Sequence, residues 1–148
     1  MPAKTATPPI RMEGLTLAVK SVKRSVAFYR EKLGFTVEID STPDFAMIRV
    51  GGKSGGTIGL LMARHANRPG AKSTTNAQHA AIHVELSTDS LDSLYRRLKA
   101  RGVRIHEPPH DEPWERSMQL YDPDGYTVEI AQGRRGRNQP KSPRADAH

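Results

Sequence analysis

The chain has 148 residues, a formal net charge of +7 at pH 7 and no cysteine. This length fits one compact domain or two small half-domains. The lack of cysteine excludes disulfides, thiolate chemistry and cysteine-ligated zinc fingers. No apolar run is long enough to cross a membrane, and the N-terminal residues lack the apolar stretch of a secretory signal. We therefore expect a cytoplasmic protein.

The first half of the chain predicts a strand, a helix and three further strands. Residues 12–20 alternate between apolar and small or polar side chains, which is typical of a strand. Ser21 is a favoured helix N-cap, apolar residues then recur at helical spacing, and Gly34 supplies a C-terminal stop. Three short alternating runs follow, at residues 35–39, 45–50 and 57–62.

The same order of elements then recurs in the second half. A strand is predicted over residues 79–86, and its alternation puts two histidines, an alanine and a glutamate on one face. Ser87 or Thr88 is expected to cap a helix that Gly102 ends. The strand that follows the helix is expected to end at Pro108, because proline interrupts strand pairing.

A β-hairpin is predicted over residues 117–131. The sequence Asp122-Pro123-Asp124-Gly125 suits a tight type I turn. Alternation gives the hairpin an apolar face and a polar face, and the polar face carries Ser117, Gln119, Tyr121, Thr127, Glu129 and Ala131. The hairpin therefore places a carboxylate, that of Glu129, in the middle of its second strand.

Together these patterns predict an α+β protein of two tandem βαβββ modules, residues 12–62 and 79–132. The other segments are a flexible leader (1–11), a linker (63–78) and a disordered tail (133–148). Two modules that each expose one sheet face would enclose a cleft. The tail holds five basic residues against one aspartate. A solubilising role is favoured over nucleic-acid or lipid binding, because the tail has no aromatic residue for base stacking.

Three segments, taken in this order, resemble one known family. They are residues 15–35 (LTLAVKSVKRSVAFYREKLGF), His79 with its strand, and residues 121–130 (YDPDGYTVEI). The chain is similar there to the vicinal oxygen chelate superfamily, which includes glyoxalases, extradiol dioxygenases, fosfomycin-resistance enzymes and bleomycin-resistance proteins. The resemblance covers about residues 12–132. It implies a glyoxalase-like fold, a cupped metal or ligand site and, often, a homodimer.

The resemblance also implies metal ligands on the first and last strands of each module. In the second module these positions fall on His79 and Glu129, whose imidazole and carboxylate suit Mn, Fe, Ni, Co or Zn. In the first module they fall on Gly14 and Leu60, which cannot bind metal. Two protein ligands rarely hold a divalent ion tightly. The alternative is therefore a protein without metal, in which His79 and Glu129 form a polar pair across the cleft.

Strand parity indicates the remaining candidates for the ligand cleft, which are Gly14, Thr16, Ser117, Gln119 and Tyr121. His83 is a candidate general base, with a hydrogen-bonded cleft histidine as the alternative. Trp114 and Arg116 are candidates for a rim that stacks on or pairs with a ligand. A structural role for Trp114, covering the end of the sheet, is the competing interpretation.

Two functional hypotheses follow. The first is a glyoxalase-like lyase or isomerase for a small oxygenated substrate, in which a metal at His79 and Glu129 polarises a ligand oxygen. His83 or a carboxylate would then move the proton. The second is a protein that sequesters a small molecule without metal, as bleomycin-resistance proteins do, and the two non-ligating positions of the first module favour it. In both cases the expected partners are a small molecule and a second copy of the chain.

Overall fold

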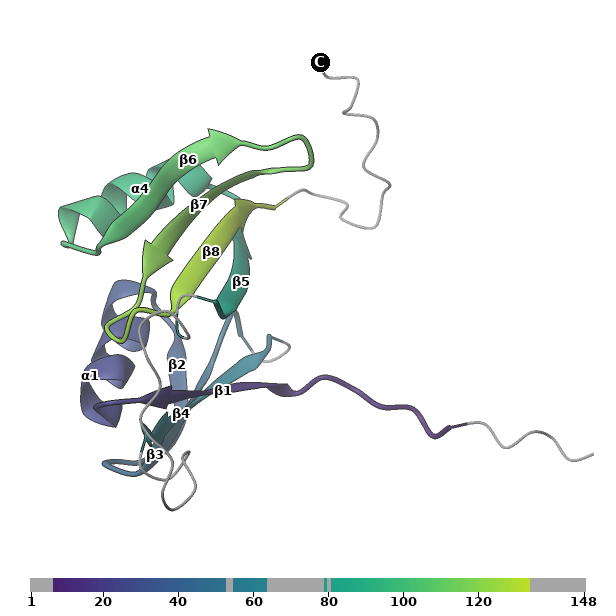
Figure 1. The fold of residues 1–148 in the computed structure, drawn as a ribbon, viewed down its shortest axis with the longest axis vertical. Coiled ribbons are helices and arrows are strands. Elements are labelled where there is room, and N and C mark those ends of the chain that lie inside the picture. The colour runs from purple at the N-terminus through teal and green to yellow at the C-terminus, as the bar shows by residue number, and fades with distance from the viewer. Residues whose placement is uncertain (1–6, 53–54, 64–78, 80, 134–148) are drawn as a thin grey trace, which may run out of the picture.

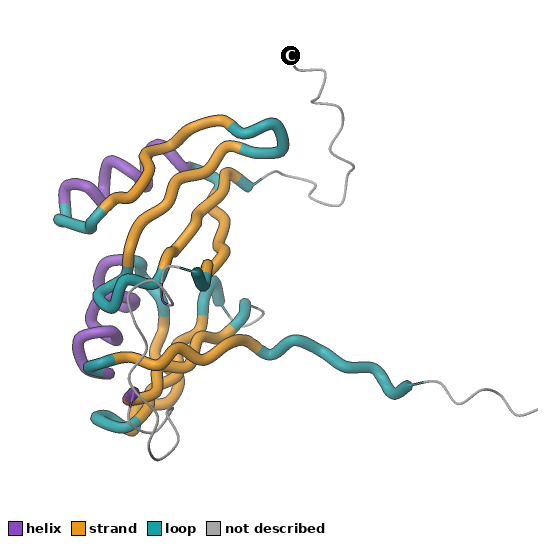
Figure 2. The backbone as a smooth tube through the Cα atoms, in the orientation of Figure 1, coloured by secondary structure: helices purple, strands orange, loops and turns teal. Residues whose placement is uncertain are grey.

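The computed structural model describes residues 7–52, 55–63, 79 and 81–133. These residues form two modules of the same βαβββ order, each built on a four-stranded mixed sheet (Figure 1). The helices of both modules lie on the same side of the molecule, at the left of the view in Figure 2. The predicted fold class, an α+β protein of two tandem modules, is confirmed.

The first module follows its predicted pattern closely. Its elements are β1 (Gly14–Val19), α1 (Val22–Ala27), the π-helical turn η1 (Phe28–Lys32), β2 (Thr36–Ser41), β3 (Phe45–Arg49) and β4 (Thr57–Met62). The strand order is β1-β4-β3-β2, and β1 runs parallel to β4. Ser21 caps α1 as predicted, since its hydroxyl accepts a hydrogen bond from the Arg24 N–H at 3.1 Å. Gly34 ends the helical segment at φ +80°, a conformation that glycine adopts without strain.

The second module repeats this topology with two shifted boundaries. Its elements are β5 (His83–Thr88), α4 (Leu91–Ala100), β6 (Ile105–Asp111), β7 (Arg116–Tyr121) and β8 (Thr127–Gln132), in the order β5-β8-β7-β6. The predicted start of the first strand at His79 is wrong. The strand begins at His83 because its parallel partner β8 begins only at Thr127, after the hairpin turn. The predicted caps Ser87 and Thr88 still belong to β5, and Ser90 precedes α4 instead.

The strand β6 also runs further than predicted. Pro108 and Pro109 do not end it, and it continues to Asp111. Its pairing with β7 shifts register twice, once on each side of Glu107. An edge strand tolerates proline because one side of its backbone has no ladder to complete, and a bulge absorbs the missing donors. β6 is such an edge.

The core lies between the sheets and the helices. Alternate residues of the strands point to the helices and are buried. They are Leu17, Val19, Ala46, Ile48, Ile58, Leu60, Val84, Met118, Leu120, Val128 and Ile130. From the helices, Val22, Val26, Tyr29, Leu91 and Leu98 pack against them. The opposite sheet faces are therefore left for polar side chains.

The hairpin turn between β7 and β8 joins the second module to the first. The Asp122 carboxylate accepts a hydrogen bond from the Tyr29 hydroxyl at 2.8 Å. The Asp124 carboxylate accepts from the Lys20 N–H at 3.0 Å and the Ser25 hydroxyl at 3.3 Å. Both aspartates are buried. Buried carboxylates need such partners, so this turn fixes how the two modules meet.

Several predicted segments lie mostly outside the described residues, namely the linker at 63–78, the tail at 133–148 and the first six residues of the leader. The described residues before β1 run outward as an extended segment in Figure 1, with Ile10 of the leader and the following Met12 exposed. Among the helices that the structure describes, none has the length and apolar character needed to cross a membrane.

Candidate functional site

Three ligand-type side chains meet on the polar face of the second sheet. The parallel register of β5 and β8 pairs Glu85 with Glu129. His83 lies two residues before Glu85, opposite Thr127. The three side chains each offer one ligand atom, and these atoms lie within 4.8 Å of one another. His83 Nδ1 is 3.5 Å from Glu129 Oε1. We call His83, Glu85 and Glu129 the β5–β8 cluster.

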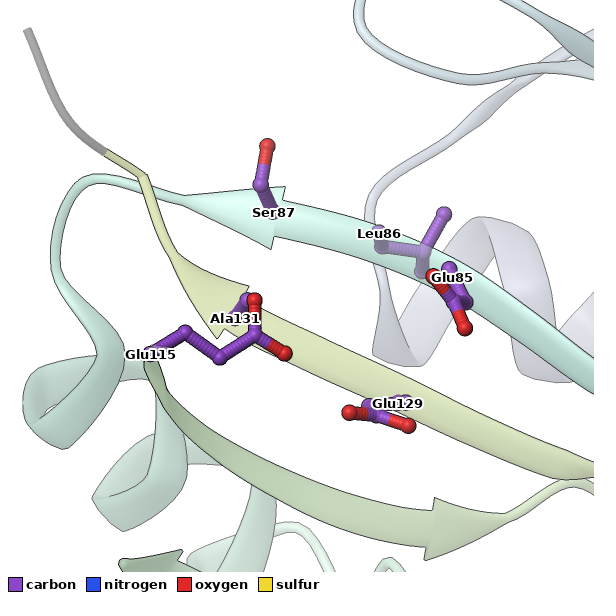
Figure 3. A pocket seen from close by; sticks show the side chains of 6 residues that line it. All are labelled: Glu85, Leu86, Ser87, Glu115, Glu129 and Ala131. Atoms are coloured by element: carbon purple, nitrogen blue, oxygen red, sulfur yellow. The ribbon is translucent and has the colours of Figure 1, made fainter. Parts of the chain in front are cut away.

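A pocket of about 220 Å³ lies beside this cluster (Figure 3). Glu85 from β5 and Glu129 from β8 point into it, and Glu115 reaches over β8 from the loop before β7. Of the described residues that line the pocket, three are carboxylates and none is basic. A concave site lined by one sign of charge concentrates the opposite sign, so the pocket favours a cation.

The fold does not bring His79 to this cluster. His79 lies four residues before β5 and is buried. Its Nδ1 is 2.8 Å from the Asp124 carbonyl oxygen, and its ring stacks on Tyr126 with centroids 4.2 Å apart. Tyr126 precedes Glu129 by three residues, or about 10 Å along a strand. The premise that His79 opens the first strand is wrong, and the geometry gives it a place at the hairpin turn.

Among its described residues, the first module has no equivalent of the cluster. Its parallel register pairs Gly14 with Thr57 and Thr16 with Gly59, so Gly14 corresponds to His83 and Gly59 to Glu129. The predicted counterpart of Glu129, Leu60, is wrong by one residue, because Leu60 points into the core. A Cβ on Gly14 would lie 2.1 Å from the Thr57 carbonyl oxygen, so any side chain at this position would force β1 and β4 apart.

The predicted cleft residues of the hairpin lie on the same sheet face as Glu129. Gln119 pairs with Glu129 across the strands, and Ser117 pairs with Ala131. The Ser117 hydroxyl is buried, whereas the Gln119 side chain is half-buried and is the more accessible of the two. The Tyr121 hydroxyl is 2.9 Å from His106 Nδ1, so it is already engaged at the edge of the sheet.

In the first module, Thr16 is exposed on the polar face of β1, as parity predicted. Its Oγ1 would lie 2.7 Å from a Cβ on Gly59. Thr16 and Gly59 are therefore packed closely side by side. Because neither offers an imidazole or a carboxylate, the first module supplies no metal ligand at this level of its sheet.

The two predicted rim residues behave differently. Trp114 is 59% exposed in the loop between β6 and β7, directly before Glu115. Arg116 instead forms ion pairs with Asp92 of α4 at 2.9 Å and with Asp111 of β6 at 3.2 Å. The Asp92 and Asp111 carboxylates raise the pKa of Arg116, since each accepts its hydrogen bonds. Arg116 thus ties the helix to the strands, and its charge is already paired.

Sequence reasoning missed Glu85 as a candidate ligand. The alternation of β5 had placed His83 and Glu85 on one face, but an assumed start at His79 drew attention to the wrong histidine. The usable signal is the spacing His-x-Glu on a strand that pairs in parallel with a strand carrying a carboxylate. Residues two apart on a strand share a face and lie about 6.6 Å apart, so both can approach one side chain on the neighbouring strand.

The β5–β8 cluster fits a divalent metal by its donors and by its dimensions. One imidazole and two carboxylates form a donor set suited to Mn, Fe, Co, Ni or Zn. Two donors that each lie about 2.1 Å from an ion are at most about 4.2 Å apart. The observed limit of 4.8 Å is close to that, so small side-chain rotations would let all three bind one ion.

A sequence model of the Glyoxalase/Bleomycin resistance protein/Dioxygenase superfamily matches residues 11–130. The chain therefore belongs to this superfamily. No curated protein matches the chain.

Several solved structures share the fold. A superfamily member from Sphaerobacter thermophilus DSM 20745 is 25% identical, with 82% of this chain and 97% of that chain covered and a TM-score of 0.66. A lactoylglutathione lyase from Agrobacterium tumefaciens is 18% identical, with 84% and 94% covered and a TM-score of 0.67. TnmS3, an antibiotic binding protein from Streptomyces sp. CB03234, is 22% identical, with 84% and 98% covered and a TM-score of 0.65.

Proposed function

We propose that this protein binds a divalent metal through the β5–β8 cluster and uses it to act on a small oxygenated substrate, as a lyase or isomerase. The observation that carries the proposal is the approach of His83, Glu85 and Glu129 to within 4.8 Å of one another. The predicted ligand Glu129 is kept, while His83 replaces His79 and Glu85 is added. The expected ions remain Mn, Fe, Ni, Co and Zn.

The chemistry divides between the ion and the side chains. A bound ion would act as a Lewis acid toward a substrate oxygen. His83 is 40% exposed and Glu129 19% exposed at the side chain, so solvent and substrate reach both. Glu115 lines the same pocket without belonging to the cluster. We propose Glu115 as the carboxylate that takes up and returns the substrate proton, because a base needs to be close to the ion without being held by it.

The alternative function is sequestration of a small molecule without metal. It is favoured by the first module, where Gly14 and Gly59 stand at the positions of His83 and Glu129. The similar fold of an antibiotic binding protein is compatible with this reading. Here the three carboxylates of the pocket would pair with a cationic group of the ligand, with Trp114 available for stacking.

Two further expectations are part of the proposal. The first is a homodimer, which we expect because members of the superfamily often dimerise. Sedimentation of the full chain at micromolar concentration tests it, and a monomer would contradict it. The second is a cytoplasmic location, which rests on the lack of cysteine.

The decisive experiment measures metal binding by tag-free protein, since a polyhistidine tag would bind the same ions. We expect one Mn²⁺ or Zn²⁺ per chain in calorimetric titration. His83→Ala and Glu85→Gln should each weaken binding by at least about tenfold, because each removes one of three ligands. Matched controls are His106→Ala and Glu107→Gln, which lie outside the cluster.

The outcomes separate the two functions. If His83→Ala and His106→Ala bind the ion equally, the cluster is not the metal site. If the wild type binds no ion, the lyase proposal fails and sequestration is favoured. In that case Glu85→Gln and Glu115→Gln should still reduce the affinity for a cationic probe such as spermidine, with a strong salt dependence.

A further inference from the structure

The two modules face each other through edge strands whose backbones are not paired. β1 and β5 are the edge strands of their sheets. Among the described residues, no hydrogen bond joins one of these strands to the other. Edge strands present rows of unpaired N–H and C=O groups. We call the gap between β1 and β5 the seam.

The hydrogen bonds at the two ends of β5 establish which of its backbone groups face the seam. The carbonyls of Ile82 and Thr88 accept bonds from Thr127 and Gly133, so they point toward β8. Backbone direction alternates along a strand. The N–H and C=O groups of Glu85, midway between them, therefore point the other way, into the seam, and those of His83 and Ser87 do the same.

The backbone groups of β1 alternate in the same way. The Glu13 carbonyl accepts a bond from the Thr57 N–H and so points toward β4. Gly14 and Ala18 then present their backbone groups to the seam. At one end this is borne out directly, since the Ala18 carbonyl accepts a hydrogen bond from the Tyr126 hydroxyl of the second module at 2.8 Å. The seam is closed there by the hairpin.

At its other end the seam opens into a pocket of about 330 Å³. It is lined by Gly14 and Leu15 of β1, by Val50 and residues 55–58, and by residues 84–87 of β5. Its lining residues include the aliphatic Leu15, Val50, Ile58, Val84 and Leu86, of which Ile58 and Val84 also belong to the core. This volume lies within the range of small-molecule sites, about 300–1,000 Å³. The pocket thus combines an apolar lining with the free backbone groups of two strand edges.

We propose that this seam pocket binds a short, extended, amide-bearing ligand of peptide-like character. An extended ligand can add a strand to the free edge of β5, because its carbonyl accepts from a backbone N–H and its N–H donates to a backbone carbonyl. An aliphatic side group of the ligand would lie among the aliphatic lining residues. Glu85 lines both pockets, and a carboxylate so close to this end disfavours an anionic group there and favours a neutral or cationic ligand.

Gly56 offers a way to block the pocket without disturbing the fold. It lines the pocket, its φ is not in the left-handed region, and a Cβ there would meet nothing within 4 Å. Gly56→Phe should therefore fill the pocket, whereas Gly56→Ala should leave most of it open. Thermal unfolding of both variants checks that they remain folded.

The probe is N-acetyl-leucine-N′-methylamide, titrated into the ¹⁵N-labelled full chain and followed by amide chemical shifts. We expect saturable shifts at Gly14, Glu85 and Ser87, and their loss in Gly56→Phe but not in Gly56→Ala. The matched probe is the N′,N′-dimethylamide, which keeps the leucine N–H but lacks the second, C-terminal N–H donor. It should bind about threefold to tenfold more weakly, the value of one hydrogen bond.

Two results would overturn the inference. One is the absence of saturable shifts at the seam, and the other is equal binding of the two probes, which needs no variant to interpret. The inference does not rest on the proposed metal site. His83→Ala should keep the probe while losing the ion, and Gly56→Phe should keep the ion while losing the probe, so the two proposals fail separately.

Discussion

The hydroxyl of Tyr29 in the first module donates a 2.8 Å hydrogen bond to the carboxylate of Asp122 in the second. Both side chains are buried. Burial raises the pKa of Asp122, and hydrogen bonds from Tyr29 and from the backbone of the turn act against that rise. Burial and the nearby Asp122 charge also raise the pKa of the Tyr29 phenol. This contact therefore holds the two modules together through residues that are 93 positions apart in the sequence.

Removing the Tyr29 hydroxyl should destabilise the whole chain. Tyr29→Phe leaves one oxygen of a buried carboxylate without this donor, which should lower the free energy of unfolding by about 1–3 kcal/mol. Urea denaturation measures the loss. Tyr126→Phe is the control, because it removes an equally short bond to a neutral acceptor, the Ala18 carbonyl. A loss for Tyr29→Phe no larger than that for Tyr126→Phe would show that the carboxylate does not depend on this donor.

Substitution by alanine should lower the stability of the protein at Gly14 and leave it nearly unchanged at Gly56. In Gly14→Ala the new Cβ would meet the Thr57 carbonyl at 2.1 Å, so β1 must move away from β4. We expect a loss of about 1–3 kcal/mol or more, as for other overpacked sites. In Gly56→Ala the Cβ enters open space, and the change should stay within about 0.5 kcal/mol. Thermal melts of both variants decide this, and equal stabilities would contradict it.

His110 should make stability depend on pH near neutrality. Its pKa is raised above the ordinary value of 6.5, because Nδ1–H donates to the Pro108 carbonyl at 3.0 Å and Nε2 faces Glu112 at 3.0 Å and Glu107 at 3.4 Å. The folded state thus binds the proton more tightly than the unfolded state. The contribution is complete below pH 6.5 and disappears as the pH rises through the folded pKa.

The variant His110→Gln isolates this contribution. Its deficit in unfolding free energy relative to the wild type should be largest in mildly acidic buffer and should shrink toward alkaline pH. An NMR titration of the His110 ring checks the cause directly. A ring pKa below 6.5, or a deficit that grows with pH, would reverse the assignment.

Arg116 should matter little to stability and not at all to ligand binding. Its partners Asp92 and Asp111 have side chains 53% and 79% exposed, and exposed ion pairs contribute about 0–1 kcal/mol each. We expect Arg116→Gln to lose no more than about 1 kcal/mol in denaturant unfolding, and less at high salt. Trp114→Ala is the comparison, because the Trp114 side chain is exposed. Both variants are tested with Mn²⁺, Zn²⁺ and spermidine. A marked loss of ligand affinity in Arg116→Gln would restore the rim hypothesis for this residue.

Much of the fold could be predicted from the sequence, because alternation and capping are local signals. Residues 57–62 were predicted as a strand with the bounds that β4 has. Boundaries failed where a distant partner decides them. The start of β5 depends on where β8 begins, and the length of β6 depends on bulges opposite β7. Neither partner can be read from the residues at the boundary itself.

Only part of the candidate site could be predicted, because the pairing of two strands decides which of its residues meet. Glu129 and His83 were recognised as chemically useful, and the hairpin that carries Glu129 was placed correctly. Which histidine and which second carboxylate meet Glu129 follows from register, and register is a property of two strands. A shift of four residues in one strand start therefore exchanged His83 for His79 as the candidate ligand.

The tight approach of Gly14 to Thr57 also limits how this chain can change. Because the two modules have the same fold, one substitution could be expected to give the first module the chemistry of the second. Histidine at position 14 would place its Cβ against the Thr57 carbonyl, so β4 would have to shift before the imidazole could act. A single substitution is thus not expected to move the metal-ligand residues from the second module to the first. Sequence change is expected to refine the second module and to leave the first as its support.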